Sequence, residues 1–168
     1  MSLSAKIFSA IHYILSGTRD ASVPVAESAP ALRPMEFANG SGDYQVSKQF
    51  ADTRQIAASG SESLDLAGGS LSDDLNNVLT FAAVKVIQIK AHDDNVNDVV
   101  VGAGTNPLIG GPFGSDGSGS VAVPPGGVFQ WVAPKTGLTV TAATGDILKV
   151  ANSGSGTAVN YDIVILGT

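Results

Sequence analysis

The stretch Val121-Ala-Val-Pro-Pro-Gly-Gly-Val-Phe-Gln-Trp-Val-Ala-Pro134 places two prolines and two glycines between two apolar runs. Proline cannot donate a hydrogen bond to a sheet, and glycine tolerates a positive φ angle. The stretch therefore predicts a strand, a sharp corner and a second strand. The second run contains Trp131, the only tryptophan of the chain. Burial of this side chain contributes on the order of a few kcal/mol, so we expect it in the core of a β-rich domain.

Alternating apolar and polar residues extend this pattern over the rest of the chain after about residue 44. Residues 50–56, 63–66 and 79–90 precede the corner, and residues 138–141, 147–150 and 161–166 follow it. A period of two is typical of half-buried strands. The adjacent Val86 and Ile87 break the alternation, which predicts a β-bulge or a twist there. About eight strands at short, turn-marked intervals predict an all-β fold, an antiparallel β-sandwich or jelly-roll-like body.

Two further segments of the body predict surfaces for contact. Residues 99–101 form a short apolar run that ends at Gly102. We expect a strand there, as an example of an exposed sheet edge to which a neighbouring protein adds a strand. Residues 104–119 are rich in glycine and serine, and their only large apolar residues are Leu108, Ile109 and Phe113. This composition predicts a long exposed loop with one anchored segment.

The first 42 residues differ from the rest, so we expect an N-terminal arm, residues 1–42, before a β-sandwich domain, residues 43–168. Residues 16–42 are punctuated by three prolines and have the composition of a linker. Before them, five apolar residues recur at helical spacing: Leu3, Ile7, Ile11, Ile14 and Leu15. This spacing predicts a short amphipathic helix within the extended arm, and we expect the five residues to bind a partner. At roughly 13 residues the helix is too short to cross a membrane.

Composition argues against several classes of function. The 168 residues carry a formal net charge of −6 and only nine scattered Lys and Arg residues, which argues against nucleic acid as a partner. The chain has no cysteine, so it has neither disulfides nor thiolate metal sites. Only 14% of the residues are charged, against about a quarter in ordinary soluble domains. Such surfaces are common in proteins that pack against neighbours in an assembly.

The sequence contains no motif of a catalytic centre. No serine lies in a Gly-x-Ser-x-Gly elbow, and the two histidines, His12 and His92, lie in different regions. Gly102-Ala-Gly104 resembles the start of a dinucleotide-binding loop, but Pro107 stands where the third glycine is needed. We expect neither catalytic residues nor a cofactor, and therefore not an enzyme.

The acidic loop after His92 offers a weak metal site. Asp93, Asn95 and Asn97 occupy the first, third and fifth positions of a calcium-loop pattern, and Asp98 is next to them. The sixth position of an EF-hand requires Gly where this chain has Asp98, and the twelfth requires Glu where it has Gly104. The EF-hand is thus rejected. An irregular calcium site from these four residues and a solvated acidic loop are the two interpretations left.

Several segments together resemble a module of small virion structural proteins of tailed bacteriophages. They are, in order, Ser63-Leu-Asp-Leu-Ala-Gly68, Leu79-Thr-Phe-Ala-Ala-Val-Lys-Val-Ile-Gln-Ile-Lys90, Pro125-Gly-Gly-Val128, Val140-Thr-Ala-Ala-Thr-Gly-Asp-Ile-Leu-Lys-Val-Ala-Asn-Ser-Gly154 and Tyr161-Asp-Ile-Val-Ile-Leu-Gly167. The similarity covers roughly residues 50–168. It implies a structural component of the virion, assembled in the host cytoplasm, whose partners are the major capsid protein or other virion proteins.

From this resemblance we expect a capsid decoration (cement) or minor capsid protein, a homo-oligomer that binds the shell through its arm and its β body. The alternative is a tail, baseplate or head-fibre component, whose loop from Gly102 to Gly119 contacts a host surface or another fibre. A second alternative is a calcium-dependent carbohydrate-binding module. The scarcity of aromatic residues, with one Trp and three Tyr, argues against sugar stacking. We expect neither a nucleic acid nor a membrane as partner.

Overall fold

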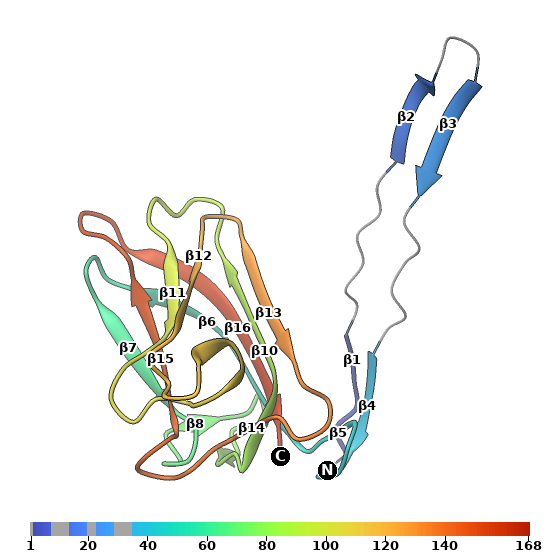
Figure 1. Cartoon of the computed structure of the whole chain (residues 1–168). Coiled ribbons are helices and arrows are strands. Elements are labelled where there is room, and N and C mark those ends of the chain that lie inside the picture. The colour runs from blue at the N-terminus through green and yellow to red at the C-terminus, as the bar shows by residue number, and fades with distance from the viewer. Residues whose placement is uncertain (1, 8–13, 20–22, 29–34) are drawn as a thin grey trace.

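The computed structural model describes residues 2–7, 14–19, 23–28 and 35–168, and in these residues the chain is all-β (Figure 1). One turn of 3-10 helix, η1 (Gly111–Phe113), interrupts the strands. The prediction of an all-β, antiparallel fold is confirmed. The body consists of two sheets, and the arm contributes separate, smaller ones.

The first sheet of the body has five strands. In spatial order its main path is β13 (Val128–Val132), β10 (Ala83–Ala91), β16 (Val159–Gly167) and β6 (Lys48–Ile56), and β14 (Leu138–Thr139) also pairs with β10. All of these pairs are antiparallel. The longest ladder joins β16 to β6, from Val159 opposite Ile56 to Gly167 opposite Lys48.

The second sheet of the body has four antiparallel strands. Their order is β12 (Ser120–Val123), β11 (Val99–Gly102), β15 (Ile147–Asn152) and β7 (Ser61–Asp65). Strand β11 pairs with both β12 and β15, so the expectation of an exposed edge at residues 99–101 is wrong. A short hairpin of β8 (Leu71–Ser72) and β9 (Val78–Leu79) lies in the connection between β7 and β10.

The sharp corner is confirmed at residues 124–127, between β12 of one sheet and β13 of the other. The amide of Gly127 donates to the carbonyl oxygen of Pro124 at 2.8 Å, and Gly126 has a φ of 71°. A positive φ at this position is adopted at low cost only by glycine. The corner therefore carries the chain from one sheet to the other.

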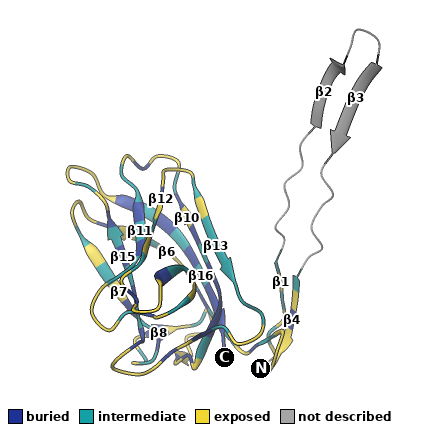
Figure 2. Ribbon diagram, viewed as in Figure 1, coloured by how far each residue is buried: buried dark blue, intermediate teal, exposed yellow. Residues whose placement is uncertain are grey.

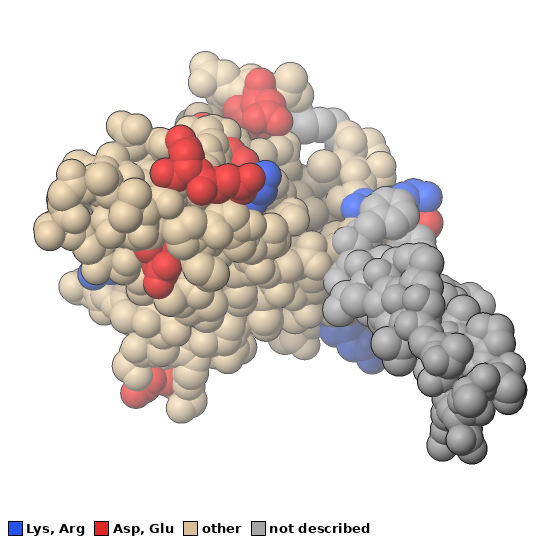
Figure 3. All heavy atoms as spheres, turned by 90° about the horizontal axis from the view of Figure 1, so that it is seen from above, with Lys and Arg blue, Asp and Glu red and all other residues tan. Residues whose placement is uncertain are grey.

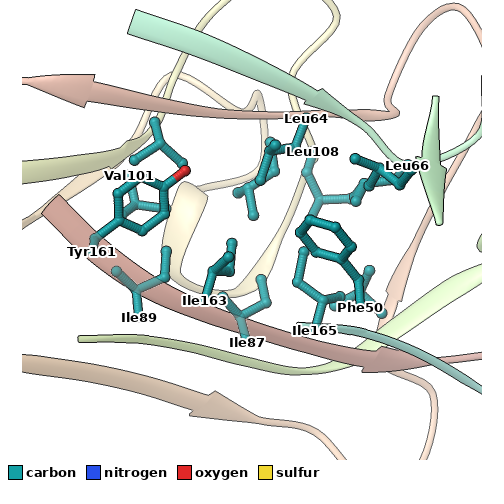
Figure 4. Close-up of a cluster of buried hydrophobic side chains, with 14 of the residues drawn as sticks. Phe50, Leu64, Leu66, Ile87, Ile89, Val101, Leu108, Tyr161, Ile163 and Ile165 are labelled. Carbon is teal, nitrogen blue, oxygen red and sulfur yellow. The ribbon is translucent and has the colours of Figure 1, made fainter. Parts of the chain in front are cut away.

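Side chains of both sheets meet in one core (Figure 4). Ile87, Ile163 and Ile165 of the first sheet point toward Leu64 of the second, and all four are 2% exposed or less. Trp131 is only partly buried, but it packs against this core as expected. A Cβ atom on Gly111 would lie 2.9 Å from its ring, so glycine lets η1 approach the indole.

The predicted irregularity in residues 79–90 is present, just before the expected place. The register of β10 against β16 shifts between Val84 and Val86. After the shift, Ile87 faces the core, whereas Val86 belongs to a second apolar cluster. Lys85, beside the bulge, is buried.

The arm contains strands where the sequence predicted a helix. β1 (Ala5–Ile7) pairs with β4 (Met35–Asn39), and β2 (Ile14–Arg19) pairs with β3 (Val23–Ser28). The helix predicted over residues 3–15 is therefore wrong at both described ends, and residues 8–13 lie outside the described part. Leu3, Ala5 and Ile7 are half-buried and alternate with exposed neighbours, so a period of two prevails over the helical spacing.

Candidate interaction site

The root of the arm, which we define as the three-stranded sheet of β1, β4 and β5 (Gln45–Val46), packs on the outer face of the five-stranded sheet, opposite to the core. Phe37 of β4 and Val46 of β5 are buried against Val86 and Leu166 of the body. Half-buried residues complete this root cluster: Leu3, Ala5, Ile7, Met35, Val132 and Val164. Exposed and half-buried residues alternate in β1, and Figure 2 shows the exposed end of β4 in yellow. The root is thus attached to the body by an apolar contact of its own.

A buried lysine holds the loop that joins the arm to the body. The side chain of Lys85 is 2% exposed, and its Nζ donates to the carbonyl oxygen of Gly42 at 2.5 Å. Two residues further, the amide of Tyr44 donates to the carbonyl oxygen of Pro134 at 2.7 Å. A buried ammonium group is costly unless it has a hydrogen-bond acceptor. The burial of Lys85 therefore depends on this loop, which supplies the acceptor of its ammonium group.

Backbone geometry closes the same loop on the arm side. β4 and β5 pair in parallel, with Ala38 opposite Gln45. The Gln45 carboxamide accepts from the amide of Gly42 at 2.8 Å. Its Oε1 lies 2.3 Å from the place of a Cβ on Gly40, whose φ is 143°. Gly40 is needed here both for its φ and for this close approach.

The five residues predicted to bind a partner are separated by the structure. Leu3 and Ile7 pack in the root cluster, on their own body. Ile14 and Leu15 belong to β2, in a sheet that contains only β2 and β3. Ile11 lies outside the described residues. The structure therefore assigns Leu3 and Ile7 to the attachment of the arm.

A groove lies next to the root, between Ile7 and the outer face of the five-stranded sheet. Its volume is about 250 Å³, and its lining includes Val86, Gln88, Gln130 and Val164. Gln88 and Gln130 stand opposite each other on β10 and β13. Lys6 also lines the groove, and its Nζ lies 2.8 Å from the Glu36 carboxylate in an exposed salt bridge. The other lining residues are uncharged, and most of the face of the body seen in Figure 3 is uncharged as well. The groove therefore suits a protein segment better than a free ion.

The calcium candidates lie in the loop between β10 and β11, where Asn95 and Asn97 form hydrogen bonds with backbone groups. Asn95 is 8% exposed; its Oδ1 accepts from the amide of Asn160 and its Nδ2 donates to the Asn160 carbonyl, both at 2.8 Å. Asn97 donates to the Thr157 carbonyl at 3.3 Å. The backbone amide of Asp98 donates to the Ser153 hydroxyl oxygen at 2.9 Å. These contacts fix the loop against the connection between β15 and β16.

The carboxylates of this loop do not converge on one point. Asp93 lies beside Gly126 of the sharp corner. In the described part of the chain there is no group of three or more His, Asp or Glu side chains with the geometry of a metal site. Because the Asn95 oxygen is already engaged, the arrangement favours the structural interpretation of the loop over the calcium site.

A shallow hollow at the same end of the body contains one hydrogen-bonded carboxylate. It is lined by Lys90, His92, Asp93, Asp94 and Asp162. Asp162 accepts from the Thr53 hydroxyl at 2.7 Å and lies 3.1 Å from His92 Nε2. The Thr53 hydrogen bond, and after it the contact with His92, lowers the pKa of Asp162 below its ordinary value. The carboxylate is therefore stabilised in its charged form, the opposite of a general acid.

A charged network joins the two sheets on the side of β6 and β7. Arg54 of β6 contacts Glu62 of β7 at 2.6 Å, and the hydroxyl of the fully buried Tyr161 donates to the same carboxylate at 2.6 Å. Burial, and then the hydrogen bond to Glu62, raises the pKa of Tyr161 far above its ordinary value. The tyrosine therefore stays protonated, and the network acts as a structural link.

The long loop after β11 is anchored as the sequence predicts. Leu108 and Phe113 are 1% exposed or less, whereas Ile109 is exposed. Ile109 lines a hollow of about 450 Å³ together with Leu138, Thr139 and Thr141. This surface combines hydroxyl groups, backbone and two apolar side chains.

Sequence reasoning missed Lys85, Phe37 and the Arg54–Glu62 pair. A lysine between Val84 and Val86 looks like any polar residue of an alternating strand, and only the bulge explains its burial. The composition of residues 16–42 predicts a linker at Phe37, and the helical spacing of residues 3–15 hides the strand with which it pairs. Arg54 and Glu62 lie on strands that follow each other in the chain but belong to different sheets. The short connection between these strands is the only signal in the sequence for their contact.

None of the helices in the described residues is long and apolar enough to cross a membrane. No protein-family model matches the chain, and no curated protein matches it.

Proposed function

We propose that the body is a jelly roll. The support is the strand order: β13-β10-β16-β6 in one sheet and β12-β11-β15-β7 in the other. Chain connections pass between the sheets from β6 to β7, from β10 to β11, from β12 to β13 and from β15 to β16. Eight strands with this alternation correspond to two Greek keys that form a sandwich.

We infer that the protein is a non-enzymatic structural component of a tailed-phage virion, a capsid decoration or minor capsid protein. The observation that carries this proposal is the construction of the arm. The core cluster begins at Phe50 and contains no residue of the arm, while the arm root is attached outside it by Phe37 and Lys85. An arm that the core does not need is suited to contact with a neighbouring molecule.

The surface chemistry supports protein partners. The net charge of −6 and the scattered basic residues disfavour nucleic acid. The groove beside the root, whose lining has Lys6 as its one charged residue, favours a polar segment of another protein. The major capsid protein, other virion proteins and further copies of the chain are the partners proposed, and the location is the virion.

Binding to expanded capsids tests the proposal. Co-sedimentation with capsids is measured for the full chain and for a chain that starts at residue 43, whose core cluster is intact. The full chain binds, and the shortened chain loses most of its binding while its circular dichroism spectrum stays β-rich. The control is the full chain with Lys135→Glu, a charge change at an exposed residue outside the arm and the groove, and it binds like the natural chain. Equal binding by the shortened chain would refute the role of the arm.

A tail, baseplate or head-fibre role is the second candidate, favoured by the exposed Ile109 beside its hollow. In that role the loop from Gly102 to Gly119 contacts a host surface or another fibre. Immunogold labelling of virions separates the two proposals. Label over the shell supports the decoration role, and label confined to the tail supports the alternative.

A further inference from the structure

We propose that the distal part of the arm, strands β2 and β3, docks on the outer face of the five-stranded sheet of a second copy of this chain. The inference rests on the proposed function and deepens it by naming the partner of the arm. Its test uses the purified chain without capsids, so a negative result would refute the docking on a second copy without refuting the binding to capsids.

The two ladders of the arm fit the register of one hairpin. Ile7 pairs with Met35, and Ile14 pairs with Ser28. Residues 8–13 separate these pairs on one side and residues 29–34 on the other, which is the same number of residues. The root and the distal pair are therefore in phase.

The arm has a greater reach than its own sheet. From Ile7 to Arg19 there are 12 residues, which span up to about 40 Å in a strand. β10 continues only five residues from Val86, beside the root, to Ala91, about 17 Å. β2 begins seven residues after Ile7, up to about 23 Å away. β2 and β3 pair with each other and with no strand of the body, so we assign the surface that covers them to another copy.

The distal hairpin needs such a cover. A two-stranded hairpin is marginally stable in water unless it packs against something else. In the sequence, Leu15, Val23 and Val25 occupy odd-numbered positions, the parity that faces the body at Ile7 and Phe37 in the root. The parity of the apolar positions that attach the root thus recurs in the distal hairpin.

The outer face of the sheet offers the matching surface on the next copy. It already holds one arm root through Val86, Val132 and Val164. The groove continues this face with Gln88 and Gln130, and Val128 of β13 is 56% exposed on the same side. The two charges of β2 and β3, Arg19 and Glu27, share the parity of Leu15 and lie near opposite ends of the ladder, while the pair Gly17–Val25 between them is uncharged.

Each copy donates one distal hairpin and receives another. Two copies that exchange hairpins with each other form a two-fold dimer, and a head-to-tail exchange closes as a larger ring when the rotation between copies allows. The expected species is a closed homo-oligomer in solution rather than a 16.9 kDa monomer.

Light scattering after size-exclusion chromatography tests the inference with two matched pairs of full-length variants. Val25→Asp interrupts the apolar parity of β3, and its control is the neighbouring Ala26→Asp. Gln130→Arg places a charge in the groove, and its control is Ala122→Arg, exposed on the outer face of the other sheet. Val25→Asp and Gln130→Arg each reduce the mass to that of a monomer, while both controls retain the oligomer. All four keep the melting temperature of the body.

Cross-linking identifies the contact, because the natural chain has no cysteine. A Gly17→Cys protein mixed with a Gln130→Cys protein is joined between copies by a short bis-maleimide, and neither protein alone is joined. A monomeric natural chain, controls as disruptive as their partners, or cross-links of Gly17→Cys with itself would overturn the proposal. A double variant joined only within one chain would overturn it as well, because the arm would then lie on its own body.

Discussion

The body and the arm are both built mainly from antiparallel strands, but different contacts stabilise them. In the described residues the core cluster of the body contains 24 buried side chains, and the root cluster contains four. Burial of apolar area is the main favourable term in folding, so almost all of the stability resides in the body. The same strand pattern therefore forms both a stable block and an attached contact element.

Truncation of a core side chain should affect the protein far more than truncation of a root side chain. Ile87 is 0% exposed between the sheets, so Ile87→Ala should cost about 2–5 kcal/mol of unfolding free energy. Ile7 is only half-buried, so Ile7→Ala should cost about 1 kcal/mol or less. Urea denaturation followed by tryptophan fluorescence measures both. Equal losses would mean that the arm belongs to the same core as the body.

Loss of the link between the sheets should have the next largest effect. Tyr161→Phe removes a 2.6 Å hydrogen bond to Glu62 but keeps the buried ring. We expect a loss of about 1–2 kcal/mol, since Glu62 retains Arg54 as partner. Glu62→Gln should give a similar loss, and the double variant less than the sum, because both changes break one network. Fully additive losses in urea denaturation would show that the network is not coupled.

Replacement of Lys85 should release the arm without unfolding the body. Lys85→Met keeps the apolar stem but loses the hydrogen bond to Gly42. This loss should lower the free energy of unfolding by about 1 kcal/mol. Limited proteolysis should then cut near residues 40–47 faster than in the natural chain. The control is Lys90→Met, an exposed lysine on the same strand. The prediction fails when both variants are cut at the natural rate.

Asp162 should make a small contribution that depends on pH. Its pKa in the folded protein is lowered, chiefly by the Thr53 hydroxyl. Its stabilisation is therefore complete above the unfolded value of about 3.9, and it is lost as the pH falls through the lower folded value. The group is 44% exposed, so solvent screening keeps the effect small. Thermal unfolding followed from about pH 6 to about pH 3, a range that includes the unfolded pKa of Asp, should show a weaker decline for Asp162→Asn. A decline as steep as in the natural chain would contradict this assignment.

The sequence predicts the body well because its signals are local. Proline and glycine at residues 124–127 specify the corner, and the alternation in β10 and β16 specifies which residues face the core. The sheet order does not follow from these signals. Residues 99–101 look like any short strand, and only the long-range pairing with β12 and β15 makes β11 internal.

The arm is predicted poorly because its residues satisfy two patterns at once. Leu3, Ile7 and Leu15 fit one face of a helix, and they also share one parity of a strand. The partner strand β4, almost 30 residues later in the chain, decides between them. A contact at this separation has no local signature, and the burial of Lys85 likewise depends on a loop far away in sequence.

Amide hydrogen exchange of the full-length chain at high and at low protein concentration shows whether the body is stable alone while the arm depends on a second copy. We expect slow exchange in β6, β10 and β16 at both concentrations. We expect protection of β2 and β3 at the high concentration and its loss on dilution, as the copies separate. Protection of β2 and β3 that is independent of concentration, or loss of protection in the body together with the arm, would contradict this expectation.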